Sequence, residues 1–267
     1  MPEQLREIVR NSVKEKLARG EVVASMTVRL VLTVEIVRIA KSAGFDTRYI
    51  DLEHSAFSMQ TASQISIMAL EAGVPAFVRV PANTPEYISR VLDGGALGVI
   101  APGVRSAAEA KAVVAAAKYP PLGERGLSPG LPLLQFRTFP ASETLPAMND
   151  ATMVIVQFES AAALAAAEEI IAVPGVDMIL IGTNDLLADL GLPGQYDHEK
   201  VDQAYARTIA ACRKRGKHVG IGGFGSRPDL VEKYVKMGGR FVSTGTDLAF
   251  LMAACTQRAK QVREIKL

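Results

Sequence analysis

The sequence predicts a (β/α)8 TIM barrel, formed by residues 1–267 as a single domain. The first observation is a series of eight short runs rich in β-branched residues, and the second is a helical stretch after each run, with apolar residues every three or four positions. The third is the length of 267 residues, which is typical of one such barrel. The runs lie at 22–28, 48–54, 75–80, 97–102, 153–160, 177–185, 218–224 and 240–247.

The runs themselves favour a barrel over an open sheet. Residues 154–156 and 178–181 are continuously apolar, which suits strands buried on both faces. An open, doubly wound sheet is the competing architecture, but it needs a glycine-rich turn after the first strand, and residues 29–35 contain no glycine. At the start of the chain, residues 1–20 place apolar residues at helical spacing, which predicts an amphipathic N-terminal helix and not a signal peptide.

The composition excludes several classes of function. Lys and Arg number 30 against 28 Asp and Glu, and the basic residues are spread over helical segments, so we expect no nucleic-acid partner. With 49% hydrophobic residues the chain is not disordered, and because no apolar window reaches about 18 residues we expect no membrane span. Cys212 and Cys255 fall in helical patterns, which indicates a protein of the reducing cytoplasm without a disulfide.

One segment interrupts the alternation of strands and helices. Residues 120–150 contain six of the fourteen prolines and no clear helix or strand period. A connection this long inside a barrel is usually a functional lid or a mobile loop, and we expect it on the active-site face between the fourth and fifth strands. The alternative is a surface excursion that packs on its own side chains.

Polar and ionisable residues stand at the ends of four predicted strands. They are Asp51, Glu53 and His54 after the second run, Arg79 in the third, Gln157 and Glu159 in the fifth, and Asn184 and Asp185 after the sixth. A charge at the end of a buried apolar run is costly unless it is paired or bound to a metal. Because barrel enzymes carry their active sites at the carboxyl ends of the strands, the pattern predicts a site on this rim.

Glu159 and Asp185 form a candidate metal site. Strand alternation puts Gln157 and Glu159 on one side of the fifth run and Phe158 on the other, and the fifth and sixth strands are neighbours. Two carboxylates without a nearby His or Cys suit a hard divalent cation, with the other positions left to water and substrate. An Arg–carboxylate ion pair, or a helix-capping role for either acid, is the alternative.

His54 and Arg79 are candidates for proton transfer and anion binding. His54 follows two acids at a strand end, so it could be a general base oriented by a carboxylate, although a single His is more often structural. Arg79 lies among buried apolar neighbours and must find an anion. That anion is either a substrate carboxylate or enolate oxygen, or the side chain of Glu53 or Asp51.

Seven motifs occur in an order that is similar to a known family. They are DLEHS (51–55), VRVP (78–81), RVLDGGALGVIAPGVRSAAEA (90–110), YPPLGERG (119–126), VQFES (156–160), VPGVDMILIGTNDL (173–186) and the closing glycine elements. Together they resemble the metal-dependent class II pyruvate aldolases of the HpcH/HpaI type, the hydroxy-oxo-heptanedioate aldolase group of the citrate-lyase-like superfamily. The resemblance covers about residues 20–250.

The resemblance implies a role for each matching residue. Glu159 and Asp185 match the metal ligands of the family. His54 matches the general base, and Asp93 matches the acid that raises the basicity of that histidine. Arg79 matches the residue that stabilises the enolate, Gln157 matches a substrate contact, and the backbone around Asn184 and Asp185 matches the site of the pyruvate carboxylate. The metal would be Mg²⁺ or Mn²⁺, with Co²⁺ or Zn²⁺ as alternatives. Without the resemblance, Asp93 is interpreted as the end of a helix before Gly94.

The implied reaction cleaves or forms a 4-hydroxy-2-oxo acid from pyruvate and an aldehyde, with no lysine Schiff base. The family also implies a homohexamer, a trimer of dimers with exchanged C-terminal helices, and residues 248–265 are apolar enough to pack on a neighbour. This chain departs from the family pattern at Thr47, where Trp is common, and at Thr183 and Leu187, where Pro and Ser are usual.

These departures remove neither a metal ligand nor the base, but they alter the pocket around the acceptor. Three alternatives stay open. A CoA-ester lyase of the same superfamily would share the acid pair and the arginine, and a non-catalytic barrel could bind a keto acid. A phosphosugar barrel is suggested by the glycine-rich turns 220–226 and 243–247, although glycines there equally serve tight turns.

Overall fold

Eight parallel strands close into a barrel in their order along the chain, β1-β2-β3-β4-β5-β6-β7-β8, in a computed structural model that describes residues 3–266. The strands are β1 Val23–Val28, β2 Thr47–Asp51, β3 Ala76–Arg79, β4 Gly98–Ala101, β5 Met153–Phe158, β6 Met178–Gly182, β7 His218–Gly222 and β8 Phe241–Ser243. Seven lie within a predicted run, and β2 begins one residue before its run, at Thr47. The predicted (β/α)8 barrel is confirmed.

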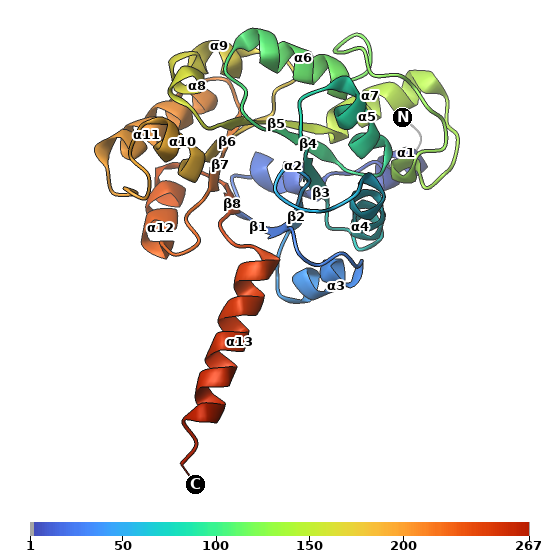
Figure 1. Cartoon of the computed structure of the whole chain (residues 1–267). Helices are drawn as coiled ribbons and strands as arrows, with labels where there is room; N and C mark the ends of the chain where they lie inside the picture. Colours follow the sequence, from blue (N-terminus) through green and yellow to red (C-terminus); the bar gives the residue numbers. More distant parts are fainter. Residues whose placement is uncertain (1–2, 267) are drawn as a thin grey trace.

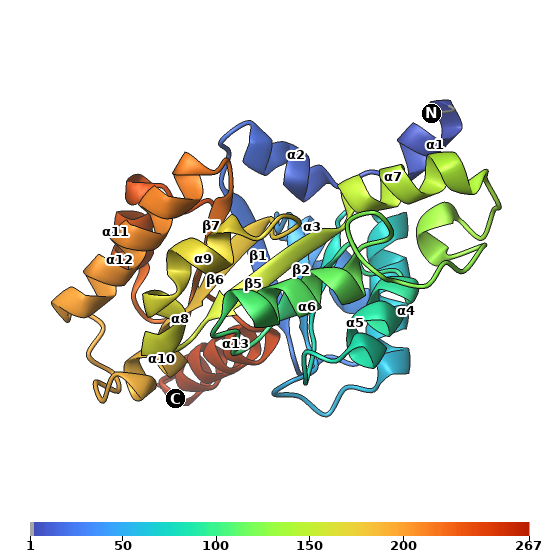
Figure 2. The same ribbon diagram turned by 90° about the horizontal axis from the view of Figure 1, so that it is seen from above.

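Helices cover the outside of the barrel (Figures 1 and 2). They are α3 Glu35–Ser42, α4 Met59–Glu71, α5 Pro85–Asp93, α6 Ala107–Ala117, α8 Ala161–Ala165, α9 Ala167–Ala172, α10 Thr183–Asp189, α11 Glu199–Lys214 and α12 Pro228–Met237. Side chains alternate along the strands, so that Met153 and Ile155 of β5 fill the barrel while Val154, Val156 and Phe158 pack beneath the helices. Gln157 and Glu159 therefore share the inner side, as expected.

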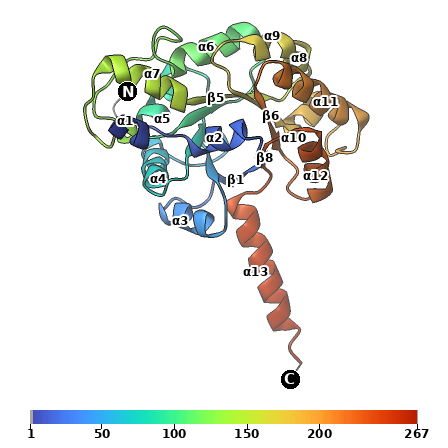
Figure 3. The same cartoon turned by 180° about the vertical axis from the view of Figure 1, so that it is seen from behind.

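The first residues form two short helices and not one. α1 spans Glu3–Ile8 and α2 spans Ser12–Ala18, and Asn11 separates them because its side chain accepts a hydrogen bond from the backbone N–H of Lys14 and donates one to the carbonyl of Ala151. Val13 and Leu17 join the apolar cluster inside the barrel, so α2 closes its amino-terminal end (Figure 3). Met1 and Pro2, part of the predicted helix, lie outside the described residues.

The segment 120–150 lies away from the pocket. It contains a short 3₁₀ helix at Pro132–Leu134 and α7 at Ala141–Ala151, and it packs against α1 through a buried cluster that includes Leu5, Leu134 and Met148 (Figure 2). Because the segment follows a helix and precedes β5, it lies at the amino-terminal end of the strands. The prediction of a lid on this chain's own active-site face was therefore wrong, and the segment packs as a surface excursion.

The last helix, α13, spans Asp247–Arg263 and projects away from the barrel (Figures 1 and 3). Apart from Asp247, its residues are exposed on every side. The large apolar side chains exposed on it are Leu248, Phe250, Leu251, Met252 and Val262. Among residues 3–266, no helix is both long and apolar enough to cross a membrane.

Candidate active site

A cavity of about 300 Å³ opens at the carboxyl ends of the strands. Of the residues predicted at the site, it is lined by Asp51, His54, Arg79, Gln157, Asn184 and Asp185. Thr27, Arg29, Tyr49 and the glycine-rich ends of β7 and β8 complete the lining. The structure thus brings six of the predicted residues into one pocket, and Glu159 lies directly behind it against Gly182.

Asp51 and Arg79 form the buried centre of the site. They are opposite each other in the register of β2 and β3, and the guanidinium donates two hydrogen bonds to the carboxylate, from Nε to Oδ1 at 3.0 Å and from Nη2 to Oδ2 at 2.7 Å. Burial on its own would raise the pKa of Asp51, but the Arg79 contacts outweigh it and leave the pKa lowered. Arg79 Nη1 also lies 2.8 Å from Glu53 Oε2. Both protein anions that the sequence offered to Arg79 therefore hold it.

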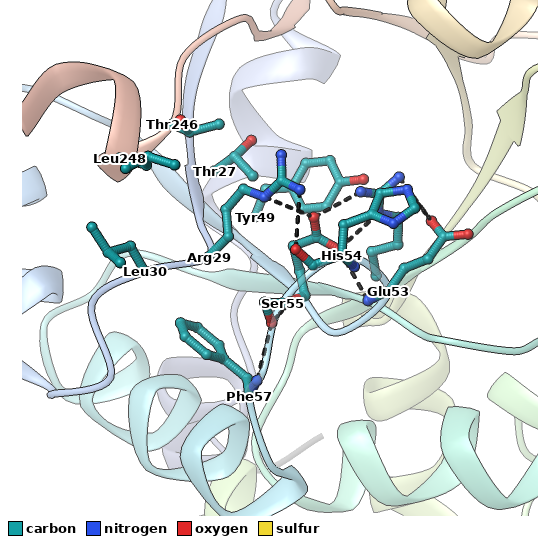
Figure 4. Close-up of polar contacts among 12 residues, drawn as sticks. Thr27, Arg29, Leu30, Tyr49, Glu53, His54, Ser55, Phe57, Thr246 and Leu248 are labelled. Atoms are coloured by element: carbon teal, nitrogen blue, oxygen red, sulfur yellow. Dashed lines mark hydrogen bonds and ion pairs between the residues drawn. The ribbon is translucent and has the colours of Figure 1, made fainter. Parts of the chain in front are cut away.

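His54 stands at the rim, with about half of its side chain exposed to solvent. Its backbone N–H donates to Asp51 Oδ1 at 3.1 Å, and Nε2 lies 3.7 Å from Glu53 Oε2 (Figure 4). The backbone carbonyl accepts a hydrogen bond from Arg29 Nη2 at 3.0 Å. The main chain of His54 is thus fixed from two sides, while the imidazole faces the open pocket.

Glu159 is a carboxylate that has lost most of its water. Burial raises its pKa to about 7, and the nearby charges of Asp185 and Glu53 act in the same direction. The Gln157 amide donates to Oε1, and the Gly103 N–H donates to Oε2 at 2.8 Å. Both Gln157 and Glu159 pack against Gly182, where a Cβ would lie 2.8 Å from Gln157 Nε2 and from Glu159 Cγ. Only glycine fits here.

Asn184 and Asp185 lie in the first turn of α10, and both are exposed to the pocket mouth. Two tyrosines hold this turn. Tyr196 Oη donates to Asn184 Oδ1 at 2.7 Å, and Thr183 Oγ1 lies 3.0 Å from Tyr205 Oη while donating to the carbonyl of Gly222 at 2.8 Å. The hydroxyl of Thr183 thus ties the turn to Tyr205 of α11 and to Gly222 of β7.

The donor set of this pocket fits a hard divalent cation. Glu159 and Asp185 offer carboxylate oxygens only, which are the ligands that such a cation prefers. Glu159 is buried and so has few water ligands of its own, and burial is the main reason that its pKa is raised. Across residues 3–266, no three His, Cys, Asp or Glu side chains gather closely enough to hold a metal. The protein would therefore contribute two ligands, and water and substrate would supply the rest.

Asp93 is not brought to the pocket. It ends α5 at the amino-terminal side of the barrel, where Arg125 Nη2 donates to its carboxylate at 2.6 Å. Arg125 is itself buried and lies over the ring of Tyr119, 4.7 Å from the centroid. Within one chain the barrel separates Asp93 from His54.

Two residues that line the pocket were not predicted from the sequence. Arg29 directly follows β1 and enters the pocket, and Tyr49 lies inside the barrel with its hydroxyl 3.4 Å from Gln157 Oε1. The rule that ionisable residues at strand ends mark the site would have identified Arg29, since Val28 is the last residue of β1. Tyr49 has no such signal, because it resembles any other apolar strand residue.

A parallel barrel with ionisable groups gathered at the carboxyl ends of its strands defines an enzyme of the (β/α)8 class. A family model described as HpcH/HpaI aldolase/citrate lyase matches residues 31–254, and the chain belongs to this family. The resemblance inferred from the sequence is thereby confirmed. The protein is a carbon–carbon lyase of the aldolase type.

Relatives match over nearly the whole chain. It is 35% identical over 260 residues to a 4-hydroxy-4-methyl-2-oxoglutarate aldolase of Hapsidospora irregularis, with 96% of each chain covered. It is 33% identical over 253 residues to a 2-keto-3-deoxy-L-rhamnonate aldolase of Escherichia coli K12, covering 94% of this chain and 92% of the relative. The crystal structure of an HpcH/HpaI aldolase from Desulfitobacterium hafniense superposes with a TM-score of 0.89 at 32% identity, covering 95% and 97% of the two chains.

Proposed function

We propose that this aldolase depends on a divalent metal, Mg²⁺ or Mn²⁺, and that it cleaves or forms 4-hydroxy-2-oxo acids from pyruvate and an aldehyde through the enolate of pyruvate. The observation that carries the proposal is the gathering of the desolvated carboxylate of Glu159 with Asp185, Arg79 and His54 at one pocket. The named substrates of the two relatives are both 2-oxo acids, in agreement with it.

Glu159 and Asp185 would hold the cation. When bound, it supplies Lewis-acid polarisation of the substrate oxygens and makes the pyruvate methyl protons more acidic. The Gly103 N–H and the Gln157 amide keep the Glu159 side chain oriented, and Gln157 also faces the substrate. Asn184 and Asp185 present the first turn of α10 to the pyruvate carboxylate.

His54 moves the proton. Its imidazole is exposed at the pocket mouth, so Nε2 or Nδ1 can take a methyl proton from pyruvate directly or through one water. Arg79 is locked in place by Asp51, and its guanidinium edge, 4.0 Å from Glu159, is oriented before reaction toward the developing enolate charge. In the cleavage direction the same groups act in reverse order.

The proposal includes a homohexamer, a trimer of dimers with exchanged α13 helices. Isolated α13 leaves five large apolar side chains exposed, which is costly in water and is relieved when a second copy covers them. Asp93 supports the same conclusion. Because the barrel separates it from His54 of its own chain, it can raise the basicity only of His54 in a neighbouring copy.

We further propose that residues 1–267 act as one barrel domain and that the enzyme works in the cytoplasm. The location is supported by two free thiols, the buried Cys212 and the exposed Cys255.

Proton exchange tests the proposal without choosing an aldehyde. Chelator-treated enzyme is incubated with pyruvate in D₂O, with and without Mg²⁺ or Mn²⁺, and loss of the methyl signal is followed by NMR. We expect metal-dependent exchange that slows about 100-fold or more in His54→Ala. His198→Ala is the matched control, because His198 caps α11 outside the pocket. Absence of exchange with every metal would refute the proposed function.

A further inference from the structure

Arg29 is held in the pocket by a dedicated contact. The carboxylate of Asp247, which is almost fully buried, accepts hydrogen bonds from the backbone N–H groups of Arg29, Leu30 and Val31 at 3.1, 2.9 and 2.8 Å. These bonds fix the turn after β1. Figure 4 shows that the Arg29 side chain extends toward His54 and Tyr49, whereas Leu30 points away.

Arg29 has spare hydrogen-bonding capacity. Its Nη2 donates to the His54 carbonyl, and its Nε lies 3.6 Å from Asp51 Oδ2. That carboxylate is already occupied by two hydrogen bonds from Arg79 and by the N–H groups of Glu53 and His54. A guanidinium has five N–H donors, so the single hydrogen bond to the His54 carbonyl leaves others available at the cavity that Arg29 lines. About a third of its side chain is open to solvent.

The two arginines of the pocket both contact Asp51 and differ in their other partners. Arg79 approaches Glu159, where the proposed metal and the enolate oxygen belong, and it is held there by Asp51 and Glu53. Arg29 lies on the His54 side. The carbon that loses its proton to His54 is the carbon that attacks the acceptor, so the acceptor must enter on this side.

From this arrangement we propose that Arg29 binds a carboxylate on the acceptor, and that the preferred acceptor is a 2-oxo acid. This inference rests on the proposed function, since it assigns the second half of the same reaction. The product then carries a carboxylate directly on C4 of the 4-hydroxy-2-oxo acid. A planar, always charged guanidinium suits a carboxylate through two parallel N–H donors.

The step is balanced without any further reactant. In cleavage, the hydroxyl on C4 gives up its proton and becomes the carbonyl of the released 2-oxo acid, while the C3–C4 bond breaks. The bonding pair remains on C3 as the pyruvate enolate, which takes up one proton to become the methyl group. Arg29 neutralises the carboxylate on C4 throughout.

Binding of two unreactive analogues tests the assignment directly. 2-Oxoglutarate has the chain length of the product and both carboxylates, and 2-oxopentanoate lacks only the second one. By calorimetry on Mn²⁺-loaded enzyme, we expect Arg29→Gln to weaken 2-oxoglutarate about 10- to 100-fold and to leave 2-oxopentanoate within about twofold. Arg29→Lys should restore part of the loss, because it keeps the charge but not the fork. Arg38→Gln, at an exposed position of α3, is the control.

Steady-state kinetics with two acceptors tests the role of Arg29 separately from the proposed aldolase activity. We expect Arg29→Gln to raise KM for glyoxylate about tenfold or more beyond its effect on KM for acetaldehyde. A slowing of pyruvate proton exchange, through the contact of Arg29 with the His54 carbonyl, affects both acceptors alike and cancels from this ratio. Equal losses for both acceptors would assign Arg29 to the support of His54 and overturn the inference. Wild-type enzyme that exchanges protons but does not prefer glyoxylate over acetaldehyde would overturn it as well, with the aldolase proposal intact. If the wild type shows no exchange, both proposals fall together.

Discussion

Gly182→Ala tests whether the absence of a side chain at Gly182 fixes the position of Glu159 in the proposed metal site. Gly182 has a φ of −84°, which any residue can adopt, so the substitution introduces no backbone strain of its own. The new methyl group would lie 2.8 Å from Glu159 Cγ and 2.9 Å from Glu159 Oε1, well inside normal contact. The side chains of Glu159 and Gln157 must therefore shift from their present positions.

The magnitude follows from overpacking in a buried site. Inserting one methyl group into a filled interior costs about 1–3 kcal/mol, which corresponds to a fall in Tm of about 2–12 °C for a chain of this size. If Glu159 and Asp185 hold the metal as proposed, displacement of one of two carboxylates should lower Mn²⁺ affinity about 10- to 100-fold, as when an outer support of a metal site is lost.

Mn²⁺ binding is measured by electron paramagnetic resonance, unfolding by calorimetry, and pyruvate proton exchange by NMR. Gly126→Ala is the control, because a Cβ there meets open space. If Gly182→Ala folded, bound Mn²⁺ as tightly as the wild type and exchanged protons at the same rate, the assignment of Glu159 as a ligand held by Gly182 would be refuted.

Three further outcomes can be measured. Thr183→Val removes the hydroxyl that joins Tyr205 and the Gly222 carbonyl. Denaturant unfolding should show that the free energy of unfolding falls by about 1–3 kcal/mol. An unchanged midpoint would contradict a structural role for this hydroxyl. Burial lowers the pKa of His218 below 6.5, so the neutral imidazole contributes its full stability above that pH. This contribution is lost as the pH falls through the lowered pKa. His218→Gln should therefore flatten the pH dependence of Tm in this acidic range, and a curve identical to that of the wild type would argue against it. Removal of residues 248–267 should lower the mass seen by light scattering, and an unchanged assembly would exclude α13 as the contact.

The strands were predictable because their signal is local. Runs such as 154–156 and 178–181 are apolar on both faces, and eight of them in order admit few closed arrangements. The pairing of Asp51 with Arg79 follows from the same order, since both stand at the ends of neighbouring strands. The structure of residues 120–150 was harder to predict, because the prolines in this segment conceal the helical pattern of α7. The end of the barrel at which a connection lies also depends on the element before it, and here that element is a helix.

The candidate site was predictable as a set of strand ends, and less so as a set of contacts. Gln157 and Glu159 were placed correctly on one face by alternation alone. Asp93 was not placed correctly, because the motif that carries it does not show that the end of α5 lies across the barrel from His54, where Arg125 pairs with it. Arg29 depends on Asp247, more than 200 residues later in the chain, and no local pattern reveals such a contact.

Asp247 connects the turn after β1 with the first residue of α13. Its carboxylate holds the turn that carries Arg29, while its backbone begins the helix that reaches out from the barrel. A tilt of α13, as in its docking in an oligomer, would therefore act on the turn that places the arginine beside His54. Quaternary assembly would then influence the choice of acceptor.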